Sequence, residues 1–198
     1  MPIRLLVGLG NPGPRYADTR HNAGFWFADR LAADRGSPFR AESRFEGEVA
    51  RITAGGASCL LQKPLTFMNK SGSAVQKLAA FYRIPAEEIL VVHDDLDLPA
   101  GTARLKAGGG HGGHNGLRDL HRHLGADYAR LRIGIGHPGV REAVIGYVLE
   151  RPGREEERAM RQAIDAALEV VDALVGGDWD LAVRRLHTKP APDGEKES

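Results

Sequence analysis

The stretch from Leu5 to Gly24, LLVGLGNPGPRYADTRHNAG, constrains the fold more than any other part of the chain. Its apolar start predicts a buried strand, and the strand runs into a glycine-rich corner. A group of polar side chains follows directly: Asn11, Tyr16, Arg20, His21 and Asn22. Open α/β sheets bind ligands at the carboxyl ends of their strands, so this corner is a candidate ligand site. The simpler alternative is that the glycines only form a turn and the polar residues only cap the next helix.

Strands and helices are expected to alternate along the rest of the chain. Patterning predicts strands at 45–53, 58–61, 89–92, 102–106 and 131–136, the first two joined as a hairpin. It predicts helices at 25–35, from Ser71 or Ser73 to Pro85, from Asn115, over 154–175, and after Asp178. This alternation predicts an α/β fold: a single three-layer α/β/α domain, residues 1–187, around a twisted, mostly parallel mixed sheet. Residues 188–198 are polar and proline-bearing, so we expect a disordered tail there.

Composition narrows the class of protein. A chain of 198 residues with 42% hydrophobic content can bury one sizeable core. The longest helical pattern is interrupted by charges, which argues against a membrane span, and the start of the chain leads straight into a strand without a signal peptide. Cys59 is the only cysteine, so no internal disulfide or thiolate metal cluster is expected. We therefore expect a cytoplasmic protein.

The charge is unevenly distributed along the chain. The formal net charge is +1, but segment 101–141 has seven Lys and Arg against two Asp, a net of +5. Segment 150–198 has eight basic against twelve acidic residues, a net of −4. A basic segment in a near-neutral protein suits contact with a polyanion, although an ordinary solvated face would have the same charge.

The glycines of the first corner, Gly8, Gly10 and Gly13, match the dinucleotide-binding pattern G-x-G-x-x-G. That pattern requires a long helix that starts at once, followed by a strand that ends in an acidic residue. Pro12 and Pro14 permit only a short turn here. The dinucleotide interpretation is therefore disfavoured.

Two side chains suit general acid–base chemistry. His21 lies in a polar loop, where an imidazole titrates near neutral pH and is either a surface residue or a general base. Asp94 follows a short apolar strand, and a carboxylate placed there can orient an imidazole, as in a catalytic triad. No serine lies in a nucleophile elbow, and Cys59 falls in an apolar strand. A hydrolase built on His21 and Asp94 would therefore use an activated water molecule, instead of a side chain, as its nucleophile.

Histidines and amides gather in the remaining loops. His93, Asp94, Asp95, His111 and His114 suggest a metal site, although their spacing matches no common zinc pattern. The loop GGGHGGHNG at 108–116 lets a ligand approach the backbone closely. Asn11, Asn69 and Asn115 all fall in loops, where an uncharged amide can hold a peptide or an oxyanion.

Six separated motifs occur together in one order: VGLGNPG, TRHNAG, KPLTFMNKSG, HDDLDLP, GGGHGGHNGL and RLRIGIGHP. With these motifs the chain closely resembles the bacterial peptidyl-tRNA hydrolases, from about Ile3 to His187. The resemblance implies a monomeric, cytosolic esterase that cleaves the bond between a peptide and the 3′ ribose of tRNA, recycling tRNA after aborted translation. It implies no metal and no organic cofactor.

The resemblance also implies roles for residues that match the motifs. His21 would activate water, supported by Asp94, and Asn11 would recognise the N-blocked peptide. The remaining substrate-binding residues would be Asn69, Asn115, Tyr16, Phe67, Met68 and His114. Lys106 and Arg132 would hold the tRNA 5′ phosphate, and the helix near 110–124 would meet the acceptor arm. Two other classes stay open at this point: a catalytically silent RNA-binding module, and a metal-dependent hydrolase that uses His93 and His111.

Overall fold

The computed structural model describes residues 1–188. Of the predicted tail at 188–198, Thr188 alone lies within the described residues, and the rest lies outside them. No helix within 1–188 is long and apolar enough to cross a membrane.

A seven-stranded sheet forms the centre of the molecule, in the order β2-β3-β4-β1-β5-β7-β6. The strands are β1 (Leu5–Gly8), β2 (Arg40–Glu42), β3 (Gly47–Ala54), β4 (Ala57–Pro64), β5 (Ile89–Asp95), β6 (Ala103–Ala107) and β7 (Ala129–Gly134). The four central strands β4, β1, β5 and β7 run parallel. β2 points the same way because it is antiparallel to β3, and only β3 and β6 run in the opposite direction. The predicted mostly parallel mixed sheet is confirmed.

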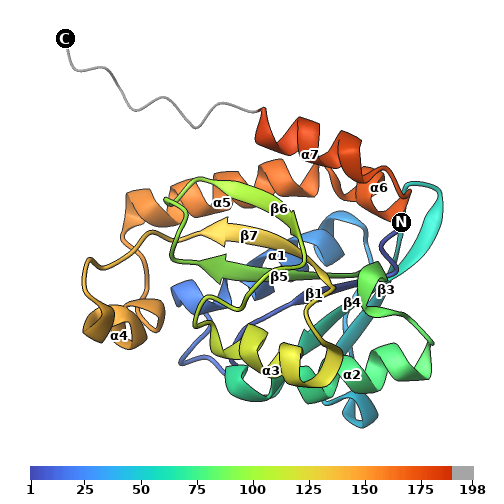
Figure 1. The fold of residues 1–198 in the computed structure, drawn as a ribbon, viewed down its shortest axis with the longest axis horizontal. Helices are drawn as coiled ribbons and strands as arrows, with labels where there is room; N and C mark the ends of the chain where they lie inside the picture. The colour runs from blue at the N-terminus through green and yellow to red at the C-terminus, as the bar shows by residue number, and fades with distance from the viewer. Residues whose placement is uncertain (189–198) are drawn as a thin grey trace.

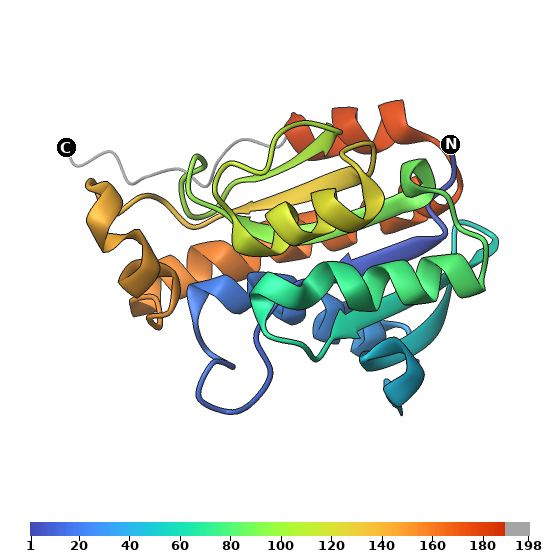
Figure 2. The same cartoon turned by 60° about the horizontal axis from the view of Figure 1, so that its bottom comes forward.

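Helices cover both faces of this sheet (Figures 1 and 2). One face is covered by α1 (Ala23–Asp34), α5 (Arg154–Leu168), α6 (Val171–Val175) and α7 (Trp179–His187), and the other by α2 (Ser71–Phe81) and α3 (Asn115–Leu124). Successive side chains of a strand point to opposite faces. Leu6 therefore packs with the first set of helices, while Leu5 and Val7 pack with the second. Both faces are buried, which explains the continuous apolar runs and confirms the three-layer fold.

Several local predictions differ from the structure. The helix expected over 154–175 is divided into α5 and α6 by a turn at 169–170, where the Val170 N–H donates to the Ala167 carbonyl, three residues back, instead of to the carbonyl four residues back. The helix α4 (Val144–Val148) and the edge strand β2 were not predicted; both are short. Strand β5 continues through Asp95, three residues beyond its predicted end.

The helix caps also differ from expectation. Asn22 does not cap α1 through its side chain, and Ser71 donates to the Met68 carbonyl instead of capping α2. The helix α3 begins at Asn115 as predicted, and the side chain of His114 caps it. Asp178 caps α7 as predicted.

Candidate active site

A cleft of about 840 Å³ lies at the carboxyl ends of β1 and β5. Parallel strands bring their carboxyl ends to one edge of a sheet, so loops that are distant in sequence meet there. The cleft is lined by every residue for which the sequence predicts a site role: Asn11, Tyr16, His21, Phe67, Met68, Asn69, Asp94, Lys106, His114, Asn115 and Arg132. Their individual roles stay predictions, but they share one cavity.

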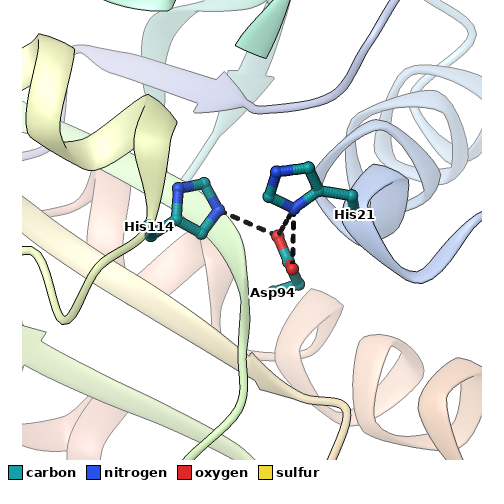
Figure 3. Close-up of side chains that lie close together, drawn as sticks. All are labelled: His21, Asp94 and His114. Atoms are coloured by element: carbon teal, nitrogen blue, oxygen red, sulfur yellow. Dashed lines mark hydrogen bonds and ion pairs between the residues drawn. The ribbon is translucent and has the colours of Figure 1, made fainter. Parts of the chain in front are cut away.

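The His21–Asp94 pair forms the floor of the cleft. His21 lies on the short 3₁₀ helix η1 (Arg20–Asn22), and Asp94 lies near the end of β5 and is only 3% exposed. The Nδ1 atom of His21 is 2.8 and 3.0 Å from the two carboxylate oxygens. Because a carboxylate only accepts hydrogen bonds, neutral His21 carries its proton on Nδ1. Its Nε2 points away from Asp94, with a lone pair free to accept a proton (Figure 3).

His114 contacts the same carboxylate from the other side (Figure 3). Its Nε2 donates to Asp94 Oδ1 at 2.9 Å, and its ring centroid lies 4.8 Å from that of His21. Its Nδ1 accepts from the backbone N–H groups of Gly116 and Leu117 at the start of α3. These contacts fix the proton of neutral His114 on Nε2, so the start of α3 orients the ring toward Asp94.

The electrostatics of the floor favour an ionised Asp94. Burial alone would raise its pKa, but the charges and hydrogen bonds of His21 and His114 hold that pKa well below its usual range. Burial alone would lower the pKa of His21, but Asp94 outweighs it and raises the pKa above the ordinary 6.5. Burial and the neighbouring His114 lower the pKa of His93 to about 4. His93 is therefore neutral and donates through Nδ1 to the Asp94 carbonyl.

The ligand atoms of His21, Asp94 and His114 lie within 4.8 Å of one another, close enough to hold a metal ion. Metal binding at His114 Nε2 would move the ring proton to Nδ1. Two backbone N–H donors already point at Nδ1, so that proton would have no acceptor and the cap of α3 would be lost. The arrangement therefore favours hydrogen bonding over metal ligation at these three side chains.

A second asparagine, which the sequence suggested only as a helix cap, positions Asn11. The Oδ1 of Asn22 accepts from the Asn11 backbone N–H at 2.9 Å, and its Nδ2 donates to the Asn11 carbonyl at 3.0 Å. The Oδ1 of Asn11 accepts from the Met68 N–H at 2.7 Å. With its oxygen engaged, the Asn11 side chain has its NH₂ group left for contacts in the cleft that it lines. The one signal in the sequence was the position of Asn22 directly after His21.

The rim of the cleft is more exposed than its floor. Asn69 and Asn115 are exposed, and Phe67 is 58% exposed with its ring edge-on to Tyr16 at 6.4 Å. Met68 is buried below them, against Gly116. A Cβ at position 116 would lie 2.6 Å from the Met68 sulfur, so glycine permits α3 to approach this closely.

The basic end of the cleft contains both residues predicted to hold the tRNA 5′ phosphate, Lys106 and Arg132. Arg132 Nε pairs with Asp95 Oδ2 at 2.7 Å, whereas Lys106 is exposed. The register of β6 and β7 places Arg130, not Arg132, directly opposite Lys106. Arg130 is only 3% exposed and donates to the carbonyls of Gly109 and Gly110, which anchors the glycine loop. Its charge alone did not distinguish it from its neighbours in the sequence.

Comparison with known proteins agrees with this architecture. The family model described as peptidyl-tRNA hydrolase matches residues 5–193. The chain belongs to the peptidyl-tRNA hydrolase family. The peptidyl-tRNA hydrolase of Alkalilimnicola ehrlichii is 52% identical over 190 residues, covering 95% of this chain and 96% of the relative. That of Neisseria gonorrhoeae is 54% identical, covering 94% and 98%.

A solved structure gives the same result for the fold. The crystal structure of peptidyl-tRNA hydrolase from Acinetobacter baumannii superposes with a TM-score of 0.94 at 47% identity, covering 96% of this chain and 97% of that one. The shared fold thus extends over nearly the whole chain, cleft included. The family expected from the sequence motifs is confirmed.

Proposed function

We propose that this member of the family hydrolyses the ester between an N-blocked peptide and the 3′ ribose of tRNA, with His21 as the general base. Membership of the family supports the reaction, and the geometry of the cleft floor supports the residue. One observation carries the assignment of His21 as the base, namely the hydrogen bond from its Nδ1 to Asp94. This hydrogen bond holds the ring proton on Nδ1 and leaves Nε2 as a proton acceptor at the floor of the cleft.

In the proposed reaction, His21 Nε2 accepts a proton from water while the water oxygen attacks the ester carbonyl. The tetrahedral intermediate then collapses, and the ribose 3′ oxygen departs with the proton held by His21. Asp94 stays ionised throughout and stabilises the imidazolium, as the orienting carboxylate of a triad does. His114 donates to Asp94 Oδ1, the oxygen that lies farther from His21 Nδ1, and so fixes the direction of Asp94.

Asn11 would provide the selection for blocked peptides. Because its oxygen is engaged by Met68, its NH₂ group faces the substrate as a donor. A donor pairs with the carbonyl of an N-acylated residue and repels a free ammonium group, which has only N–H donors. This would spare aminoacyl-tRNA that is still in use for translation.

The exposed amides and the basic end would bind the rest of the substrate. Asn69 and Asn115 would position the water and stabilise the oxyanion, while Tyr16, Phe67 and Met68 would line the peptide path. Lys106 would meet the tRNA 5′ phosphate, and Arg132 would contribute charge from its pair with Asp95. Salt should weaken this binding. We propose further that the protein acts as a cytoplasmic monomer without metal or organic cofactor.

The test is release of N-acetylated amino acid from N-acetyl-aminoacyl-tRNA, beside the same tRNA with a free amine, each with and without chelator. Native protein should cleave only the blocked substrate, equally well in chelator. H21A should lose turnover while tRNA affinity is nearly unchanged. H123A, at a histidine that is absent from the cleft lining, is the matched control and should turn over normally. Normal turnover by H21A would refute the assignment, and tRNA binding without any turnover would favour the RNA-binding alternative.

A further inference from the structure

One wall of the cleft is formed by the segment between β7 and α5. It contains the 3₁₀ helix η5 (Arg141–Ala143) and α4 (Val144–Val148), and it lines the cleft with His137, Arg141, Val144, Ile145, Val148 and Leu149. Figure 1 shows α4 outside the three layers, beyond the end of the sheet toward which β5 and β7 point. A segment so placed needs specific contacts to hold it beside the cleft.

The surface that α4 gives to the cleft is mainly apolar. Ile145 is 74% exposed and Leu149 is 39% exposed, although both line the cavity. Apolar side chains that stay in contact with water inside a cleft are suited to bind an apolar group of a ligand. A tRNA phosphate would not be recognised by such a surface.

Arg20 holds this segment in place. Its side chain is almost fully buried, and its Nε and Nη2 atoms donate to the two carboxylate oxygens of Glu156 on α5 at 2.7 and 3.0 Å. Its Nη1 donates to the carbonyl of Tyr147 on α4 at 2.8 Å. Its backbone N–H donates to the carbonyl of Glu150, just after α4, at 3.1 Å.

The Tyr147 ring completes the attachment. The Arg20 guanidinium lies 3.8 Å from the centre of that ring, and the Tyr147 hydroxyl donates to the Ile135 carbonyl and lies 3.2 Å from Glu156 Oε1. Breaking this bidentate pair is costly, because the buried Arg20 guanidinium would keep an uncompensated charge, although the Glu156 side chain is 26% exposed. Since Arg20 directly precedes His21, the position of α4 is tied to that of the proposed general base.

We propose that Arg20 is a positioning residue, which fixes α4 beside His21 so that its apolar wall receives the side chain of the amino acid esterified to tRNA. This inference rests on the proposed function. The ester carbonyl must lie next to His21 Nε2 during the reaction. The proposal places the side chain of the esterified residue against α4, which contacts η1.

The test compares kcat/KM for N-acetyl-phenylalanyl and N-acetyl-glycyl esters of the same tRNA. R20M should lower the Phe/Gly ratio about tenfold, because a misplaced wall loses contacts that discriminate apolar side chains. R30M is the matched control: Arg30 also pairs with a carboxylate of α5, Asp165 at 3.0 Å, but it lies on α1 and is absent from the cleft lining. Its ratio should equal that of native protein.

Two further variants keep the proposal testable if R20M does not fold. E156Q retains the size of the side chain but offers one accepting oxygen in place of two, and I145A truncates an exposed apolar side chain. Each should lower the ratio about threefold. A native Phe/Gly ratio in I145A and in the folded Arg20 or Glu156 variants would overturn the proposal, even if H21A had confirmed the general base. Normal turnover by H21A would instead count against the proposed function.

Discussion

The floor and the rim of the cleft differ in how fully the protein has organised them. On the floor, His21, Asp94 and His114 are held by hydrogen bonds of 2.8 to 3.0 Å in a buried environment. On the rim, Phe67, Asn69 and Asn115 are exposed. Groups fixed before the substrate arrives need no reorganisation during the reaction, whereas rim groups are ordered by the substrate. Substitutions on the floor should therefore change kcat, and substitutions at rim residues proposed only to bind the substrate, such as Phe67, should change KM.

Among the substitutions that test this difference between floor and rim, removing the charge of Asp94 should change the rate most. In D94N, an amide NH₂ would face the N–H donors of His21 and His114, so one ring would change its tautomer. We expect kcat to fall about 10²- to 10³-fold, with KM changed less than about threefold. The matched control is D95N, at the next residue, which pairs with Arg132 at the basic end. An equal loss of kcat in both variants would contradict a special role for the floor.

Asn11 lies between floor and rim, and its substitution should act on substrate choice. In N11A the Met68 N–H loses its acceptor, and the substrate loses the proposed amide donor. We expect kcat/KM for the N-acetylated substrate to fall about 10- to 100-fold, in line with loss of one or two buried hydrogen bonds. The kcat/KM for the free-amine substrate should fall less, so the ratio of kcat/KM between the N-acetylated and the free-amine substrate should decrease. Rates for both substrates on the same tRNA measure this, and unchanged discrimination would remove Asn11 from the recognition of blocked peptides.

Lys106, an exposed residue at the basic end, should show the signature of a rim contact. K106A should raise KM a few-fold, leave kcat nearly unchanged, and reduce the slope of log affinity against log salt by about one. Tyrosine fluorescence or filter binding over a salt series would measure that slope. The same slope in K106A and native protein would exclude a phosphate contact at this position.

The smallest effect on stability is expected at Phe67. Its side chain is 58% exposed, so F67A should change the free energy of unfolding by less than about 0.5 kcal/mol. Its KM for a peptidyl substrate should nevertheless rise, because the ring lines the cleft beside Tyr16. Urea denaturation and steady-state kinetics on one preparation separate the two quantities. A large loss of stability would show that the rim is part of the folded core.

The same comparison explains what could be predicted from the sequence. His21 and Asp94 are 73 positions apart, yet both follow apolar strands, and the rule that parallel strands share one edge predicts that they meet. The sheet and its layers follow from hydrophobic runs of characteristic length. Partners that depend on a single tertiary contact could not be predicted. No periodic pattern in the sequence indicates the hydrogen bonds between Asn22 and Asn11, between the His114 ring and the start of α3, or between Arg20 and Glu156.

The pH dependence of kcat/KM tests the central claim most directly. A general base must be neutral to accept a proton, and Asp94 raises the pKa of His21 above 6.5 in spite of burial. The rate should therefore rise with pH through one ionisation above 6.5 and then level off, and the same pKa should appear when the His21 ring is titrated by NMR in the free protein. In D94N that ionisation should move to lower pH, because the influence that raises it is gone. A rate that does not vary between about pH 5 and pH 9, or that falls as His21 loses its proton, would contradict His21 as the base.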